Sequence, residues 1–303
     1  YGGKKPNMTG IAQRAKRVSP SLTLEITAKA KKMKAEGKPV ISFGAGEPDF
    51  NTPEYIVKAA EHALEEGMTK YTPASGTDAL KQAIALKFKK DNTLEYDSKC
   101  IVVSNGAKHA LYNAFSALVN PGEEVIIPAP FWLTYPELVK LCDGVPVYVH
   151  TKAENGFKMT ADELKSALTN KTKAVLINNP CNPTGAVYTR AELESLAKVL
   201  ENTDVYIISD EIYEKLTYTD GEYYSIAQYS ENIKDRTVVV NGVSKTYSMT
   251  GWRIGYTASN AEVAKAISSI QSHTTSNPNS IAQYAAQEAY LHSEGEKIGR
   301  AHV

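Results

Sequence analysis

Long apolar runs, an excess of charge of one sign and abundant cysteine are all lacking from this sequence of 303 residues. Its apolar runs, such as Val205–Ser209 and Thr237–Val240, are far shorter than the roughly 20 residues that a membrane-spanning helix needs. Lysine and arginine total 34, as do aspartate and glutamate, so the net charge indicates no nucleic-acid partner. The three cysteines lie about forty residues apart, which argues against a disulfide framework and against a metal site. These absences favour a cytoplasmic α/β enzyme.

Motifs of several common enzyme classes are also absent. The chain has no GxGxxG after a strand, no GxxxxGKS or GxxxxGKT, no GxSxG and no HExxH. Nicotinamide-dependent, P-loop and hydrolase activities therefore lose the motifs that usually support them. The polar residues that follow the predicted strands become the main evidence on function, because open α/β sheets bind ligands beyond the carboxyl ends of their strands.

From about residue 100 onward, short β-branched runs alternate with helical patterns. The runs are apolar on both faces, as in strands buried within a parallel or mixed sheet, and they are Ile101–Ser104, Val125–Ile127, Val145–Val149, Ala174–Ile177, Val205–Ser209, Thr237–Val240 and Ile254–Ala258. Thr160 with Glu163, and Thr189 with Glu192, form capping-box patterns that open amphipathic helices between the strands. Seven strands alternating with helices predict a doubly wound α/β domain.

The first 50 residues differ from this pattern. Ser21–Glu36 is predicted to be helical, and residues 39–50 are predicted to form a strand followed by a loop rich in glycine and proline. We interpret this part as an N-terminal arm outside the sheet, with a boundary near residues 50–54.

Two polar segments at strand ends suit an anion site and a rigid loop. Ser104–Lys108 leaves the first predicted strand through Gly106, where backbone amides and a helix N-terminus can face a phosphate. Asn178–Gly185 follows the fourth strand, and its prolines and glycine hold Asn182 in a fixed loop. Taken singly, each segment is also compatible with an ordinary turn.

Two further segments carry charge. Asp210 follows the fifth predicted strand, and a buried carboxylate there needs a partner such as a cationic heterocycle; a solvated loop aspartate is the alternative. Lys245 follows the sixth strand and can form a Schiff base if a dry site lowers its pKa; a surface charge is the alternative. Arg253, eight residues further on, can offer a forked donor to phosphate. Four such segments on one sheet edge are far more specific than any one of them.

Long signatures add a family resemblance. They are AGEPDFNTP at 45–53, KYTPASG at 70–76, NPCNPTG at 179–185, SDEIYE at 209–214 and SKTYSMTGWRIGY at 244–256. From about Met8 to Leu291 the chain resembles a class I, pyridoxal-phosphate-dependent aminotransferase of fold type I, closest to the aspartate aminotransferase subgroup. The resemblance implies an α/β fold with a seven-stranded, mainly parallel sheet flanked by helices. It assigns residues 8–53 to an arm and part of a small domain, and residues 54–296 to the large cofactor-binding domain.

The resemblance also implies roles around the pyridoxal ring. Lys245 resembles the catalytic lysine that holds the cofactor as a Schiff base and later moves a proton between substrate and cofactor carbons. Asp210 resembles the partner that keeps the pyridine nitrogen protonated. Tyr213 and Asn182 resemble donors to the phenolic oxygen of the ring. Trp132 resembles the aromatic residue that stacks on the ring, with a core aromatic as the alternative.

The phosphate site and a second subunit are implied in the same way. The positions that match the phosphate site and its surroundings are Gly106, Ala107, Lys108, Ser244 and Arg253. Gly242 stands where related enzymes often carry a hydroxyl and cannot donate one. Tyr71 matches a tyrosine that reaches the cofactor phosphate of the neighbouring subunit, which implies a homodimer with shared sites.

Substrate recognition is partly implied as well. The positions that match substrate-facing ones are Gly46, Lys108, Trp132, Asn182, Ser21 and Thr23. Gly46 matches a backbone donor near the substrate α-carboxylate. Lys108, together with two residues of the arm, matches positions near the distal carboxylate of an acidic substrate, although a lysine at a helix start is commonly solvated. Lys108 therefore favours aspartate or glutamate over alanine or aromatic amino acids.

The chain departs from the family at both ends. Family members run to roughly 390–400 residues, so we expect about 90 C-terminal residues to be missing. That segment completes the small domain and supplies the arginine that binds the substrate α-carboxylate. Lys297–Val303 matches one reading frame of a sequencing adapter, and residues 1–7 precede Met8, where relatives usually begin. We interpret both ends as non-native and exclude them from the fold.

The predicted activity is transfer of the amino group of L-aspartate to 2-oxoglutarate by a ping-pong mechanism at Lys245, with an amino acid and a 2-oxo acid as partners. One alternative is another enzyme of the same fold, either a broad-specificity aminotransferase or a carbon–sulfur β-lyase that releases ammonia and pyruvate without an acceptor. The other alternative is a non-catalytic ligand-binding fragment.

Overall fold

The computed structural model describes residues 10–42, 46–219 and 221–292. Seven strands form one sheet in the order β1-β7-β6-β5-β4-β2-β3. Their bounds are β1 (Ile101–Ser104), β2 (Glu124–Ala129), β3 (Val145–His150), β4 (Thr172–Asn178), β5 (Tyr206–Asp210), β6 (Thr237–Gly242) and β7 (Gly255–Ala258). β7 is antiparallel to both of its neighbours, and the other pairs are parallel. The predicted strands and the mainly parallel sheet are confirmed.

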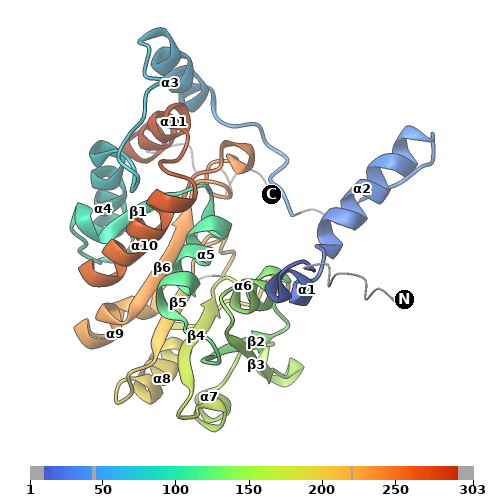
Figure 1. The fold of residues 1–303 in the computed structure, drawn as a ribbon, viewed down its shortest axis with the longest axis vertical. Helices are drawn as coiled ribbons and strands as arrows, with labels where there is room; N and C mark the ends of the chain where they lie inside the picture. Colours follow the sequence, from blue (N-terminus) through green and yellow to red (C-terminus); the bar gives the residue numbers. More distant parts are fainter. Residues whose placement is uncertain (1–9, 43–45, 220, 293–303) are drawn as a thin grey trace, which may run out of the picture.

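Helices cover both faces of the sheet (Figure 1). One face packs against α5 (Ala107–Leu118), α6 (Thr134–Leu141) and α10 (Ala261–Thr274). The opposite face packs against α4 (Asp78–Asn92), α7 (Ala161–Ala167), α8 (Arg190–Leu200), α9 (Glu231–Asp235) and α11 (Ser280–Leu291), and α3 (Glu54–Glu65) packs on α11. Alternate strand residues face opposite sides, so Val102 joins the first layer while Ile101 and Val103 join the second.

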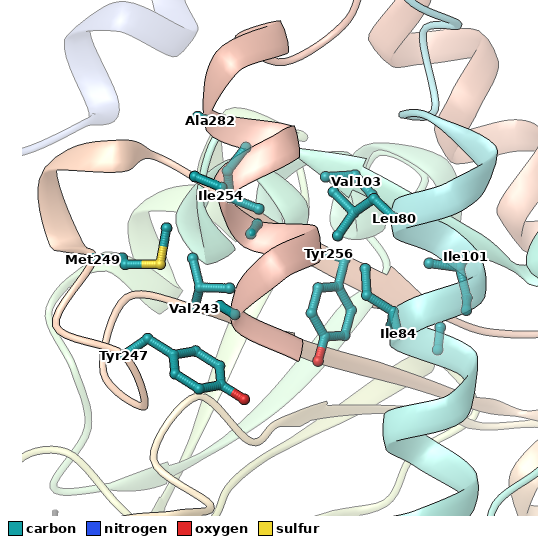
Figure 2. Packing of buried hydrophobic residues seen from close by; sticks show 14 of the residues in the cluster. Leu80, Ile84, Ile101, Val103, Val243, Tyr247, Met249, Ile254, Tyr256 and Ala282 are labelled. Atoms are coloured by element: carbon teal, nitrogen blue, oxygen red, sulfur yellow. The ribbon is translucent and has the colours of Figure 1, made fainter. Parts of the chain in front are cut away.

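A dense cluster holds the β1 and β7 end of the sheet against α4 (Figure 2). Leu80 and Ile84 of α4 pack with Ile101, Val103 and Tyr256, and all five side chains are buried. Full burial of one such aliphatic side chain stabilises the fold by about 1.5–3 kcal/mol. This packing fixes the two strands whose ends approach the site described below.

Both predicted capping boxes are present. The Thr160 hydroxyl accepts a hydrogen bond from the backbone of Glu163 at the start of α7, and Thr189 does the same for Glu192 at the start of α8. In each case the glutamate side chain reaches back to the threonine backbone, so two donors at the helix start are satisfied. Local sequence therefore decides where these two helices begin.

Two expectations about strands are wrong. β3 is not buried on both faces, because it is the last strand of the sheet and has one neighbour; Val145 and Tyr148 are 44% and 40% exposed. The strand expected within residues 39–50 is absent from the described residues 39–42 and 46–50. The end segments 1–7 and 297–303 lie outside the described residues.

The N-terminal arm consists of α1 (Gln13–Arg17) and α2 (Leu22–Ala35), so the helix predicted over 21–36 is confirmed. α2 stands clear of the sheet domain (Figure 1), and neither helix has a buried residue. The backbone N–H of Ser19 donates to Glu137 of α6 at 2.8 Å, which anchors the arm between its two helices. Among the described residues no helix is long and apolar enough to cross a membrane.

Candidate active site

Four strands deliver the polar segments to one edge of the sheet. β1, β4, β5 and β6 end at Ser104, Asn178, Asp210 and Gly242. β4, β5 and β6 are parallel, and β1 runs the same way because both β1 and β6 are antiparallel to β7. All four segments therefore emerge at the carboxyl edge, where such sheets bind ligands.

Asp210 is a deeply buried carboxyl group at this edge, with 2% of its surface exposed. The Tyr135 hydroxyl donates to its Oδ2 at 2.7 Å, and the backbone N–H of Ile212 donates to its Oδ1 at 3.2 Å. Burial raises the pKa of the Asp210 carboxyl to about 6, although both hydrogen bonds oppose the rise. A carboxylate in this environment gains most from a buried cationic partner.

The loops that follow β4 and β5 bring Asn182 to Tyr213. The backbone N–H of Asn182 donates to Oδ1 of Asn178 at 2.7 Å, and Nδ2 of Asn178 donates to the carbonyl of Asp210 at 3.1 Å. Burial raises the pKa of Tyr213 and the charge of Asp210 adds to the rise, whereas a hydrogen bond with the Asn182 side chain lowers that pKa. The two loops are thus joined beside the buried carboxylate.

Lys245 lies half-buried in the connection between β6 and β7. Its Nζ donates to the carbonyl oxygen of Gly46 at 2.5 Å and lies 5.6 Å from the centroid of the Tyr213 ring. Burial lowers the pKa of Lys245; Glu47 opposes that effect and Arg253 reinforces it. A lowered pKa leaves more of the amine neutral, which is the form that attacks carbonyl carbons.

Arg253 closes over the turn where α5 begins. Gly106 precedes α5 with a φ of +86°, and a Cβ at this position would lie 2.2 Å from Nη2 of Arg253. The guanidinium donates to the carbonyl oxygens of Thr250 at 2.9 Å and Asn105 at 3.4 Å. None of the ion pairs within the described residues involves Arg253, so its charge is available to an anion at the helix start.

The backbone of the same turn is packed against β7. A Cβ on Gly255 would lie 2.2 Å from the backbone nitrogen of Ala107, so only glycine fits there. Ser244, next to Lys245, is buried on the neighbouring connection. These contacts hold the amide end of α5 in one position.

Positive charge is concentrated around this helix start. Nζ of Lys108 lies 4.8 Å from the centroid of the Trp132 ring. Burial lowers the pKa of Lys108 and the charge of Arg253 lowers it further, as Arg253 also does for Lys245. An anion bound between these cations would relieve their repulsion.

Three of the predicted site residues are not brought to this edge. Tyr71, in the connection from α3 to α4, is 91% exposed. Ser21 and Thr23 lie at the start of α2, and their backbone carbonyls accept hydrogen bonds from residues of α2 itself. The other predicted residues, Gly46, Gly106, Ala107, Lys108, Trp132, Asn182, Asp210, Tyr213, Ser244, Lys245 and Arg253, gather at the carboxyl edge of the sheet.

Sequence reasoning missed two residues that shape the site. Tyr135 binds Asp210 and packs edge-on against Trp132, with 5.4 Å between ring centroids. Trp132 lies just before α6 and Tyr135 in its first turn, where the backbone N–H of Tyr135 donates to the carbonyl of Trp132 at 3.1 Å; this short spacing along the chain is the signal that could have linked them. Gly255 had no comparable signal, because its need for glycine comes from a contact with a distant turn.

Comparison with known proteins identifies the family. The sequence pattern of aminotransferase class I and II matches residues 38–298. The chain belongs to this family.

Its relatives include the aspartate aminotransferase of Bacillus sp. strain YM-2, which is 58% identical over 280 residues, covering 92% of this chain and 71% of the relative. The aspartate/prephenate aminotransferase of Cereibacter sphaeroides is 50% identical, covering 93% of this chain and 71% of the relative. A solved structure of Thermus thermophilus aspartate aminotransferase with maleate superposes with a TM-score of 0.92 at 42% identity, covering 95% of this chain and 74% of that one.

Aminotransferases of this family depend on pyridoxal phosphate, and the residues at the sheet edge fit it. Asp210 is a buried carboxylate suited to a cationic ring nitrogen. The turn at Gly106 leaves no room for a side chain beneath Arg253, so the guanidinium lies directly beside the start of α5, where both it and the backbone amides are suited to a phosphate. Among the described residues no cluster of side chains is suited to a metal ion.

Proposed function

We propose that this aminotransferase moves the amino group of L-aspartate to 2-oxoglutarate, giving oxaloacetate and L-glutamate in two half-reactions. The observation that carries the proposal is the position of Lys245, whose amine has a lowered pKa and lies between the Tyr213 ring and Gly46 beside the buried Asp210. Relatives that are 54–58% identical bear the name aspartate aminotransferase, which supports the choice of substrate.

Lys245 is the proposed catalytic residue. Bound pyridoxal phosphate supplies an electron-withdrawing ring next to the substrate Cα. The amine of Lys245 takes the proton from Cα, and burial favours this role because it lowers the pKa of the amine towards neutrality. The same amine would then return the proton to the adjoining carbon of the cofactor, so that Lys245 serves first as base and then as acid.

The surrounding residues orient the ring. Asp210 would hold the proton on the pyridine nitrogen, and its burial would make that ion pair stronger than in water. Tyr213 and Asn182, whose side chains are hydrogen-bonded to each other, would donate to the phenolic oxygen, and Trp132 would cover one face of the ring. The residues proposed to hold or border the phosphate are Gly106, Ala107, Lys108, Ser244 and Arg253.

Substrate carboxylates are proposed to bind on the open side of this site. Gly46, next to Lys245, would face the α-carboxylate, and Lys108, over the Trp132 ring, would attract the distal carboxylate of an acidic substrate. Trp132 and Asn182 border both cofactor and substrate. Ser21 and Thr23 are proposed substrate-facing residues on the resemblance alone.

A homodimer with shared sites is proposed from Tyr71. A tyrosine with 91% of its surface exposed beside a phosphate-binding domain has its hydroxyl free to reach a second copy. We further propose that residues 8–53 form the arm and part of a small domain and that residues 54–296 form the large domain. The three cysteines are free, which suits a reducing compartment such as the cytoplasm.

An absorbance titration tests the proposed function. The purified chain is mixed with pyridoxal phosphate, and the spectrum is recorded before and after addition of L-aspartate. The expected result is a lysine-bound cofactor band that bleaches with aspartate and is restored by 2-oxoglutarate, and Lys245→Ala should lose both changes. A spectrum of free cofactor alone from the unaltered chain would contradict the proposal.

The same sample separates the rival activities. A carbon–sulfur β-lyase would release pyruvate and ammonia from a cysteine conjugate without 2-oxoglutarate, whereas transamination needs the acceptor. A binding module would show the cofactor band but no bleaching with any amino acid. Bleaching by alanine or phenylalanine as readily as by aspartate would indicate broad specificity and would argue against the role of Lys108.

A further inference from the structure

The segment that carries Tyr71 runs along the free edge of β1. We call residues 71–77 the Tyr71 segment. The backbone N–H of Val103 donates to the carbonyl of Ser75 at 3.0 Å, and a Cβ on Gly76 would lie 2.8 Å from Cβ of Val103. The segment therefore lies in direct contact with the strand that leads into the turn before α5.

One buried glutamine joins this segment to that turn. Gln271 of α10 is fully buried, and its Nε2 donates to the carbonyls of Ala74 at 2.6 Å and Val103 at 2.7 Å. Its Oε1 accepts from the hydroxyl of Ser104 at 2.6 Å and from Nδ2 of Asn113 at 2.9 Å. All four hydrogen-bonding positions of the amide are used. One amide thus binds the Tyr71 segment, the end of β1 and α5 at once.

A second buried glutamine holds both ends of the segment. Gln283 of α11 is fully buried, its Oε1 accepts from the backbone N–H of Thr77 at 2.8 Å, and its Nε2 donates to the hydroxyl of Thr72 at 3.0 Å and to the carbonyl of Pro278 at 2.9 Å. Thr72 follows Tyr71 directly, so the backbone next to the tyrosine is fixed from the protein interior.

We propose that Gln271 and Gln283 are positioning residues of the transamination. Gln271 sets the distance between the Tyr71 segment and the phosphate turn, which we define as Ser104–Ala107, and Gln283 sets the direction in which Tyr71 leaves the surface. The inference rests on the proposed roles of Tyr71 and of the phosphate turn. In a dimer with shared sites, the Gln271 side chain would then link a subunit's own phosphate site to the Tyr71 that this subunit contributes to the site of its partner.

A purely structural role would predict something different. If Gln271 only filled the core, its loss would weaken the whole domain evenly, and exchange of backbone amide hydrogens would rise everywhere. If it positions the two segments, its loss should act first on them, because four partners in those segments and in α5 lose their hydrogen bonds together.

Hydrogen exchange and cofactor affinity test the inference on the full chain. Gln271→Met should speed amide exchange in both residues 71–77 and residues 101–107, with residues 174–178 of β4 unchanged. Gln283→Met should speed exchange in residues 71–77 alone. The dissociation constant for pyridoxal phosphate should rise about tenfold in Gln271→Met, since its bonds position the groups around a charged phosphate.

Thr257→Val is the matched control. Thr257 is fully buried on β7, opposite Val102, and its hydroxyl has no hydrogen-bond partner. This change alters a buried side chain of the same region without removing a bond, so both exchange and affinity should stay at their original values. If Gln271→Met fails to fold, Ser104→Ala removes one of the four bonds and should raise the dissociation constant about threefold.

The outcomes separate the two proposals. If the unaltered chain binds the cofactor and Gln271→Met binds it as tightly as Thr257→Val does, the positioning role is wrong and the proposed function stands. Faster exchange in only one of the two segments, or in neither, in Gln271→Met would also overturn the role. If the unaltered chain binds no cofactor, the proposed function fails, and coupled exchange alone then decides whether Gln271 links the segments.

Discussion

The sheet edge and the N-terminal arm both carry proposed site residues, but they hold them very differently. Asp210 is buried at the end of β5 with hydrogen bonds to both carboxylate oxygens. Ser21 and Thr23 lie on α2, a helix with no buried residue. The fold of the sheet domain thus preorganises the cofactor half of the site, while the substrate half depends on where the arm is placed. Cofactor binding and substrate choice should therefore respond to different mutations.

The buried ion pair behind the sheet edge gives the largest expected effect. Nζ of Lys87 in α4 lies 2.5 Å from Oε1 of Glu214, the residue that follows Tyr213, and both side chains are almost fully buried. Lys87→Met leaves Glu214 without its cation, so the free energy of unfolding should fall by about 3–5 kcal/mol in urea titrations. Lys89→Met is the matched control, because its partner Glu95 is exposed and little or no stability should be lost. If the two variants lose the same free energy of unfolding, the sheet domain does not depend on this buried framework, and the contrast with the arm fails.

A smaller effect of opposite sign is expected at Asp210. Its folded pKa of about 6 lies above the usual aspartate value of 3.8, so the folded state binds the proton more tightly. The carboxylate therefore costs no stability below about pH 4, costs more as the pH rises, and has its full cost above about pH 6. Asp210→Asn should raise the unfolding free energy of the cofactor-free chain by about 3 kcal/mol at pH 7 and by almost nothing at pH 4.

The same variant should lose activity while it gains stability. Asparagine cannot hold the proton on the pyridine nitrogen, so turnover should fall by about 10²–10³-fold. Unfolding curves at the two pH values and a transamination assay check both parts. A variant that is less stable at pH 7 than the unaltered chain would show that the buried carboxylate is not a cost to the fold.

The smallest effect is expected on the arm. Leu24 of α2 is 69% exposed, so Leu24→Ser should change the unfolding free energy by less than about 0.5 kcal/mol in dilute solution. Leu196→Ser, on the buried face of α8, provides the contrast and should cost several-fold more. A loss at Leu24 that grows with protein concentration would show that a second copy covers the arm.

Sequence predicted best what depends on neighbours along the chain. The strand β5 and the capping box at Thr189 follow from local patterns of apolar and polar residues. The strand expected around Ile41 failed because a strand also needs a partner edge, and the position of that edge is not a local property. The exposure of β3 was missed for the same reason, since the order of strands in a sheet is set by long-range packing.

The site shows the same limit. Asp210 and Lys245 were identified because each directly follows a strand, and the resemblance then supplied their roles. The hydrogen bond from Tyr135 to Asp210 spans 75 residues, so neither residue reveals it alone. The resemblance named Ser21 and Thr23 as well, but their position relative to the sheet depends on contacts beyond their own helix.

The antiparallel run of β7 has a consequence for building chimaeras. Because β6 ends and β7 begins at the same edge of the sheet, the short connection between Gly242 and Gly255 carries both Lys245 and Arg253. A crossover inside this connection would join the lysine of one parent to the arginine of another across a backbone that tolerates no side chain at Gly255. With crossovers before β6 or after β7, Lys245 and Arg253 would come from the same parent.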